Sequence, residues 1–269
     1  MWKLDVFSRV SFRTDIYILR SYFRSENMST HGSIKRILTL AIVAAIFSIP
    51  VAGLGQNSFN IDLDCEFCPP EGGGGRPSSS FFAAAGPNQA GFWNMIPASG
   101  MIDTALRDLS GNLTSVIMSG PSGGGGGGFN FDGNTGDFAL LENDGRQVEH
   151  DVWTFSGLAT GLYEIFTYSA WPNDFITRTA ITVPGAEIET LIVTGPMPGD
   201  NRLIEGLTHS IHRIRHISGD LVIQIDRGPE HRAFVNGFQI AAVVPEPATL
   251  LGISTGLLAL LMRRRRKPS

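Results

Sequence analysis

Three of the six histidines of this 269-residue chain fall within eight residues, in the stretch His209-Ser-Ile-His-Arg-Ile-Arg-His216. Histidine is a common zinc ligand and general base, so this stretch is a candidate site for a metal-dependent hydrolase. On a strand, His212 and His216 would share one face with Ile214 between them, and His209 would lie on the other. Because zinc needs ligands that converge, the competing interpretation is a solvated polar face of a strand.

A second candidate, the oxygen-rich stretch Asp132-Gly-Asn-Thr-Gly-Asp137, resembles half of a calcium-binding loop. Its candidate ligands are Asp132, Asn134 and Asp137, since carboxylate and amide oxygens suit Ca²⁺. An EF-hand would require glutamate at the twelfth position, where this chain has Asn143. The competing interpretation is an ordinary turn rich in Asp, Asn and Gly. Apart from this calcium ion, we expect no cofactor.

The aromatic residues offer candidate sugar contacts in two turn-rich stretches. Trp93 is followed by Asn94, and Trp171 is followed closely by Asn173 and Asp174. A loop tryptophan beside polar side chains gives a sugar a flat apolar face together with partners for its hydroxyl groups. The alternative is that each tryptophan caps the end of a hydrophobic core.

Cys65 and Cys68 are the two cysteines of the chain, and two prolines and four glycines follow within seven residues. Zinc would need two further ligands, and a redox motif would be expected to open a helix. In an exported chain we expect a local disulfide, with free thiols or a redox site as alternatives. The Gly, Pro and Ser content of residues 56–80 predicts a linker.

The elements that must position these residues are short strands. From residue 81 to residue 243 the chain alternates β-branched and aromatic segments with turn residues and has no long helical period. This spacing predicts an all-β fold, an antiparallel β-sandwich. The expected strands are Leu113–Met118, Gln147–Phe155, Leu162–Ala170, Ile176–Val183, Thr190–Val193, Ile211–Ile217, Leu221–Asp226 and Arg232–Val243.

Two further details bear on the body of the chain. The six-glycine run Gly123–Gly128 predicts a flexible loop, because no Lys-Ser/Thr pair follows it to make a phosphate-binding loop. In the last expected strand, Asn236 shares a face with Phe234, Phe238 and Ile240. A buried amide needs partners, so we expect Asn236 to bond to nearby loop backbone.

Charge is distributed unevenly along the chain. Residues 56–243 hold nine arginines, no lysine and 21 acidic residues, a formal net charge of −12. Such a body would repel phosphate backbones, so we expect no nucleic-acid partner. The basic residues gather instead at the two ends of the chain, where a membrane would orient them.

The N-terminal region, residues 1–55, has the features of a secretory signal. The pair Lys35-Arg36 precedes the 13-residue apolar run Ile37–Ile49, and small residues follow. The run is short for a membrane span of about 20 residues, so we expect a signal helix cleaved near residues 53–55 by the secretion machinery. An uncleaved anchor is the alternative. Met28 lies at a normal distance before the signal, and we expect translation to start there.

The C-terminal region, residues 244–269, has three parts in order: Val244-Pro-Glu-Pro-Ala-Thr, the apolar run Leu250–Met262 and the basic run Arg263–Lys267. Together they closely resemble the PEP-CTERM sorting signal of Gram-negative bacteria. The resemblance implies an exported protein whose tail is cut by an exosortase, a membrane transpeptidase.

By the same resemblance, Pro245, Glu246 and Pro247 form the recognition motif, and the apolar run forms a transmembrane helix that anchors the chain transiently in the inner membrane. The residues that keep its end in the cytoplasm are Arg263, Arg264, Arg265 and Arg266. The implied destination is the cell surface or the extracellular space, often beside exopolysaccharide.

The body resembles more loosely the galactose-binding-like jelly rolls found in many such proteins. The shared features are Gly91-Phe-Trp-Asn94, the turn Ser156-Gly-Leu-Ala-Thr-Gly-Leu-Tyr163 and Asn236-Gly-Phe-Gln-Ile240. We therefore expect a non-enzymatic surface or matrix protein that binds glycans, exopolysaccharide among them. The alternatives are a secreted metal-dependent hydrolase using His209–His216 and a structural surface protein without a ligand.

Overall fold

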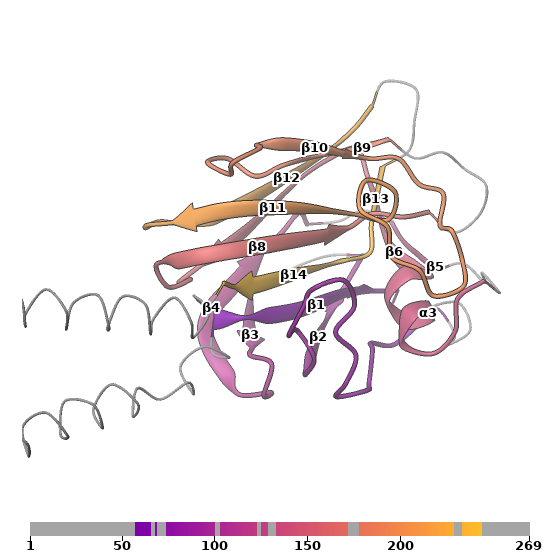
Figure 1. Ribbon diagram of the computed structural model, residues 1–269, viewed down its shortest axis with the longest axis horizontal. Helices are drawn as coiled ribbons and strands as arrows, with labels where there is room; N and C mark the ends of the chain where they lie inside the picture. The colour runs from indigo at the N-terminus through magenta and orange to yellow at the C-terminus, as the bar shows by residue number, and fades with distance from the viewer. Residues whose placement is uncertain are drawn as a thin grey trace, which may run out of the picture. The chain divides into compact units, whose positions relative to one another are not determined.

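The computed structural model describes residues 57–65, 68, 74–99, 103–122, 125–128, 133–171, 178–228 and 233–243. These residues form a mostly β body of several sheets (Figure 1). The expected signal helix in residues 1–55 and the expected sorting helix in residues 244–269 lie outside the described residues. Within the described ranges no helix has the length and apolar character that a membrane crossing requires.

The first sheet has five strands. In spatial order they are β11 (His209–His216), β8 (Gly161–Tyr168), β14 (Gly237–Ala242), β1 (Phe59–Asp64) and β2 (Trp93–Pro97). The first and last strands of the described body, β1 and β14, are antiparallel neighbours in the middle of this sheet. Strands β1 and β2 pair in parallel, and every other pairing among the named strands is antiparallel.

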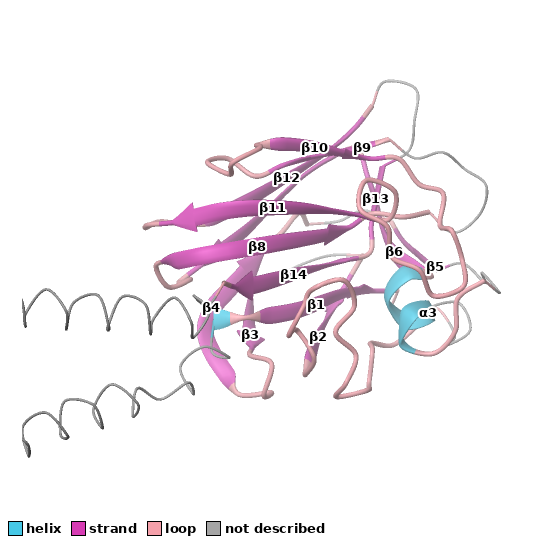
Figure 2. Ribbon diagram, in the orientation of Figure 1, coloured by secondary structure: helices cyan, strands magenta, loops and turns pink. Residues whose placement is uncertain are grey.

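The second sheet has six strands, and a smaller third sheet has three. The second is made of β10 (Thr190–Val193), β9 (Thr179–Thr182), β12 (Leu221–Arg227), β7 (His150–Ser156), β4 (Leu113–Ser119) and β3 (Thr104–Arg107). The third is made of β13 (Ala233–Val235), β6 (Asp144–Val148) and β5 (Gly126–Gly128). Helix α3 (Asp137–Glu142) comes directly before β6 and lies beside it (Figure 2).

Expected and observed strands overlap across most of residues 113–243, but the expected strands Gln147–Phe155 and Arg232–Val243 are each divided into two strands of different sheets. Three further expectations need correction. The expected linker 56–80 contains β1, which pairs on both sides with other strands. The sheet that contains β1 is mixed rather than wholly antiparallel, because the long connection from β1 to β2 returns the chain to the same end of the sheet. The run Gly123–Gly128, expected as a loop, contributes β5, whose glycines pair with Asp144–Arg146 of β6.

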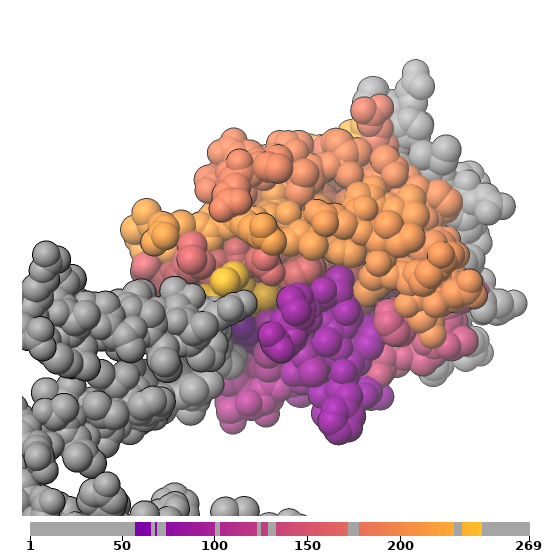
Figure 3. All heavy atoms as spheres, viewed as in Figure 1, coloured from indigo at the N-terminus to yellow at the C-terminus, as the bar shows by residue number. Residues whose placement is uncertain are grey.

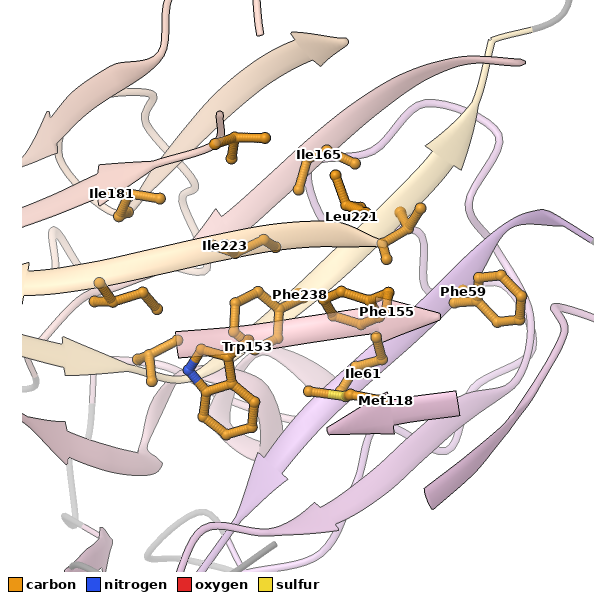
Figure 4. Close-up of a cluster of buried hydrophobic side chains, with 14 of the residues drawn as sticks. Phe59, Ile61, Met118, Trp153, Phe155, Ile165, Ile181, Leu221, Ile223 and Phe238 are labelled. Carbon is orange, nitrogen blue, oxygen red and sulfur yellow. The ribbon is translucent and has the colours of Figure 1, made fainter. Parts of the chain in front are cut away.

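The main core lies between the five-stranded and six-stranded sheets. Phe238 of β14 packs against Trp153 and Phe155 of β7, with ring centroids 5.3 and 6.1 Å apart (Figure 4). Ile61 of β1 and Ile223 of β12 belong to the same buried cluster. The two sheets therefore pack face to face, with apolar side chains contributed by alternate residues of each strand.

The outer face of the five-stranded sheet is also covered. The segment between β1 and β2, residues 74–92, is here called the covering segment, and it loops in front of the two strands (Figures 1 and 3). Its Phe82 packs beside Trp93 of β2 and edge-on against Phe138 of α3. A second apolar cluster therefore forms on this outer face, and both faces of β1 are buried.

Polar side chains bind the covering segment to the sheet. Gln239 of β14 donates through Nε2 to Asn60 Oδ1 and to the carbonyl oxygen of Ala83, at 2.8 and 3.0 Å. Its Oε1 accepts from the backbone N–H of Gly86 and from the hydroxyl of Tyr168. These buried groups are hydrogen-bonded, so the polar outer face of β14 is satisfied without water.

Asn236 connects the sheets at the break between β13 and β14. Its Nδ2 donates to the carbonyl oxygens of Glu142 and Asp144, at 3.0 and 2.7 Å, and its Oδ1 accepts from the N–H of Ala170. The expectation that this buried amide bonds to nearby loop backbone is confirmed. The amide thereby fixes the start of β6 against the end of β8.

The aromatic contact between the two large sheets yields a stability prediction. We expect Phe238→Ala to lower the free energy of unfolding of the purified chain by about 3–5 kcal/mol, because it leaves a cavity between Trp153 and Phe155. Val152→Ala, at a half-exposed position of β7, should change it by less than about 0.5 kcal/mol. Urea unfolding followed by tryptophan fluorescence measures both, and equal losses would contradict this account of the core.

Candidate functional site

The described residues bring three carboxylates together beneath the covering segment. Asp62 and Asp64 alternate with the core residues of β1 and therefore share its outer face, and Asp144 is the first residue of β6. One oxygen from each of the three side chains lies within 4.8 Å of the others. Asp62 and Asp144 are fully buried, and Asp64 is 6% exposed. We call these three residues the aspartate cluster.

Backbone groups hold two of the three carboxylates in place. Asp144 Oδ2 accepts from the N–H of Cys65 at 2.8 Å, and Asp64 Oδ1 accepts from the N–H of Gly75 at 2.6 Å. The disulfide between Cys65 and Cys68 lies in the same stretch of chain. The cluster thus connects β1, the cysteine segment, the beginning of the covering segment and β6.

Three oxygens of the cluster are buried without a hydrogen-bond partner. Both carboxylate oxygens of Asp62, and Oδ1 of Asp144, are buried without one. Burial raises the pKa of Asp62 well above its usual range, and the negative charges of Asp144 and Asp64 raise it further, while Arg76 lowers it by less. Burial also raises the pKa of Asp144. Three acids are therefore concentrated at a place where two accept backbone hydrogen bonds and Asp62 has no hydrogen-bond partner.

Such an arrangement can bind a hard cation. Carboxylate oxygens are preferred ligands of Ca²⁺ and Mg²⁺, and a cation would satisfy the oxygens that have no donor. Close approach of the backbone maintains the geometry beside Asp144. Gly145 has φ of +145°, and a Cβ atom at this position would lie 2.3 Å from the carbonyl oxygen of Val235. Only glycine fits there.

The calcium ligands expected from sequence do not assemble in this way. Asp132 lies outside the described residues. Asn134 donates to Glu142 Oε2 at 2.7 Å, and Asp137, at the start of α3, accepts from the backbone N–H of Ser78. Burial raises the pKa of Glu142 to about 8. Asn134 Nδ2 and Asp137 thus bond to separate partners, while Asn134 Oδ1 is buried without one.

The two tryptophans expected to contact sugar are buried rather than exposed in loops. Trp93 belongs to β2 and donates from Nε1 to the carbonyl oxygen of Phe82, and it is 1% exposed. Trp171 is 4% exposed and packs edge-on against Phe234. Asn94 is also buried and donates to the carbonyl oxygens of Asn60 and Arg107. Asn173 and Asp174 lie outside the described residues.

A surface hollow lies at the edge of the covering segment, with a volume of about 330 Å³. Its walls combine hydroxyl groups, one guanidinium and apolar side chains. The lining includes Arg76, Ser78, Ser80, Phe92, Leu109 and Ser110. The Arg76 guanidinium lies over the Phe92 ring, 4.4 Å from its centroid, and donates to the carbonyl oxygen of Trp93. The hollow therefore presents polar and apolar groups side by side.

The histidine stretch forms β11, and the expectation of a solvated polar face is wrong. His209, His212 and His216 are all buried. His209 packs near the rings of Tyr168 and Phe166, and its Nδ1 is 3.1 Å from Thr208 Oγ1. Burial lowers the pKa of His209 to about 4 and also lowers that of His212. Among the described residues, the cluster with metal-binding spacing contains aspartates alone.

Sequence reasoning missed the aspartate cluster because it placed Asp62 and Asp64 in a linker. The available signal was the alternation in Phe59-Asn-Ile-Asp-Leu-Asp64, with apolar residues at every second position. This pattern predicts a strand, and a strand puts two aspartates on one face. Asp144 is 80 residues from Asp64 in the chain and carries no local signal that it joins them.

One comparison with known proteins matches the tail of the chain. Residues 243–267 match the PEP-CTERM protein-sorting motif. The motif implies that the chain is exported, processed by an exosortase and sorted to the cell surface. The resemblance inferred for the tail from Pro245, Glu246, Pro247 and the basic run is thereby confirmed.

The body has weaker likenesses. No curated protein matches the chain. A solved structure of Bacteroides uniformis beta-glucuronidase 2, covalently bound to cyclophellitol-6-carboxylate aziridine, is 14% identical over 72% of this chain, with a TM-score of 0.38. A second Bacteroides uniformis beta-glucuronidase is 17% identical over 56% of this chain, with a TM-score of 0.35. The matches cover 19% and 20% of those chains, so the body distantly resembles part of each.

The buried histidine of β11 yields a pH prediction. Because the pKa of His209 is lowered to about 4 by folding, the folded state resists protonation, and stability should fall as the pH drops from about 6.5 to about 4. By linkage, His209 accounts for a loss on the order of 2 kcal/mol between pH 7 and pH 5. We expect His209→Gln to show a smaller loss over this range.

Urea unfolding at pH 7 and pH 5 measures how much of the free energy of unfolding each protein loses between the two pH values. Arg215→Gln, at an exposed position of the same strand, is the matched control and should retain the wild-type loss. If His209→Gln lost as much unfolding free energy as the wild type, groups other than His209 would cause the acid sensitivity.

Proposed function

We propose that this chain is a non-catalytic surface protein whose β body is the cargo delivered by its C-terminal sorting motif. The observation that carries the proposal is the position of the motif. The last strand of the body, β14, ends at Ala242, and the match to the sorting motif begins at residue 243. The motif thus follows a body that is already complete, and its removal would leave every described strand in place.

The non-catalytic part of the proposal is supported by the environments of the candidate groups. His209, His212 and His216 are all buried, so none of these side chains is open to a substrate at the surface. Asn134 and Asp137 are engaged in contacts within the protein. Rapid hydrolysis of glycosides or esters by the purified protein, lost in His212→Ala, would favour the metal-dependent hydrolase instead.

We propose the jelly roll as the topology of the body. The pairing of β1 with β14 in the middle of one sheet, and the packing of that sheet on a second one, support this assignment. The galactose-binding-like resemblance of the sequence fits the same topology. Fold alone does not define a ligand, so the argument for binding rests on the surface.

The sorting proposal predicts a defect in processing. Replacing Pro245, Glu246 and Pro247 together by alanine should leave an uncut precursor in the membrane fraction, because the exosortase would lack its recognition motif. Mass spectrometry of the chain from cells and medium measures the C-terminus in each fraction. Pro268→Ala, which changes a proline outside the motif, should be processed normally, and normal processing of the triple variant would contradict the proposal.

The second part of the proposal is that the protein binds a glycan, and the surface hollow is the observation that favours it. Serine hydroxyls and the Arg76 guanidinium can bond to sugar hydroxyl groups, while Phe92 and Leu109 contribute apolar wall. We propose that exopolysaccharide binds in this hollow, with Trp93 supporting it from below the surface rather than touching the sugar.

Removal of the guanidinium should weaken binding to exopolysaccharide from the host culture. We expect Arg76→Gln to reduce the affinity by about tenfold, which corresponds to about 1.4 kcal/mol. Affinity electrophoresis with the purified polysaccharide measures this. Arg107→Gln, an exposed arginine that does not line the hollow, is the matched control. If the polysaccharide slowed neither the wild type nor the two variants, a structural surface protein without a ligand would be favoured.

A further inference from the structure

We propose that the aspartate cluster is a calcium site, in which Asp62, Asp64 and Asp144 each give a carboxylate oxygen to one Ca²⁺. This site is distinct from the loop Asp132–Asp137 that the sequence suggested, and it does not depend on glycan binding. Its evidence is the convergence of three acids on different parts of the chain, together with buried oxygens that lack partners.

The spacing of the oxygens suits one ion. Ca²⁺ binds oxygen at about 2.3–2.6 Å, so two ligands on opposite sides of the ion stand about 4.6–5.2 Å apart. The three oxygens lie within 4.8 Å of one another, so they can reach a common ion with little movement. Ca²⁺ accepts six to eight oxygens in flexible geometry, and water or carbonyl oxygens would complete its shell.

Asp62 is the residue that most clearly requires a cation. It is fully buried, its carboxylate faces those of Asp64 and Asp144, and neither of its oxygens has a hydrogen-bond partner. A buried ionised carboxylate without a partner is costly, and two like charges nearby add repulsion. Arg76 acts on Asp62, but its Nη1 donates to the carbonyl oxygen of Trp93 and its guanidinium stacks on Phe92.

The hydrogen bonds around the cluster indicate what the ion would stabilise. Asp144 holds the backbone of Cys65, and Asp64 holds that of Gly75, which lies beside Arg76 at the start of the covering segment. A Ca²⁺ shared by the three acids would hold Asp144 and Asp64 in place and so stabilise the hydrogen bonds that they accept from Cys65 and Gly75. It would therefore join β1 to β6 and fix the entry of the covering segment onto the outer face of the sheet.

The test compares calcium binding and thermal unfolding of the full-length chain, stripped of metal with EDTA and then dialysed with or without Ca²⁺. Elemental analysis should find one Ca²⁺ per chain. The melting temperature should rise by about 5–10 °C when free Ca²⁺ exceeds its dissociation constant a hundredfold. The same concentration of Mg²⁺ should give a smaller rise, because Mg²⁺ demands shorter, stricter octahedral geometry.

Two variants make the assignment specific. Asp62→Asn should abolish the calcium-dependent rise and, without metal, should melt no lower than the wild type, because it removes a repelling buried charge. A purely structural carboxylate would instead lower the melting temperature in both conditions. Asp137→Asn, the matched control from the loop suggested by sequence, should retain the bound ion and the rise.

A measurement on the wild type alone keeps the proposal testable if Asp62→Asn fails to fold. Hydrogen exchange of a peptide covering residues 65–76 should slow at least tenfold on adding Ca²⁺, because the N–H groups of Cys65 and Gly75 bond to the proposed ligands. Failure of the wild type to bind Ca²⁺ would overturn the site and leave a proton-sharing cluster of acids. Loss of the ion in Asp137→Asn but not in Asp62→Asn would move it to the loop.

Discussion

The burial of β1 on both faces is the constraint on which this structure depends. Its apolar residues face the core between the two large sheets, and its polar residues face the covering segment. A strand that alternates in this way normally leaves its polar face to water. Here a chain segment closes over it, so each polar side chain on that face must find a partner inside the protein.

The hydrogen-bond partners of these polar side chains differ along β1. The difference distinguishes residues with a structural role from residues of the candidate site. At Asn60, Nδ2 donates to the backbone carbonyl oxygen of Gln89 and Oδ1 accepts from the side-chain amide of Gln239, so both polar atoms have a partner. At Asp62 the oxygens have no partner, and the neighbours are further acids. On the outer face of β1, Asn60 is therefore fully part of a hydrogen-bond network. Two residues later, Asp62 is surrounded by acids whose negative charge a cation would neutralise.

Local patterns in the sequence predicted much of the fold. Strands such as β12 and β10 follow from their β-branched residues and flanking turns, and the C-terminal sorting motif follows from three adjacent elements. The sequence-based prediction was wrong where it followed amino-acid composition instead of the alternation of apolar and polar residues. Gly-rich β5 pairs through backbone alone, and β1 stands next to linker-like sequence. The burial of Trp93 and Trp171, and the meeting of Asp64 with Asp144, are products of tertiary packing that local spacing does not contain.

The position of β14 has a consequence for the assembly of the five-stranded sheet. This strand joins the pair β8 and β11 to the pair β1 and β2, so the five-stranded sheet is divided until β14 arrives. It is also the last described strand before the sorting motif. The five-stranded sheet is therefore continuous only after the segment that precedes the sorting motif has folded.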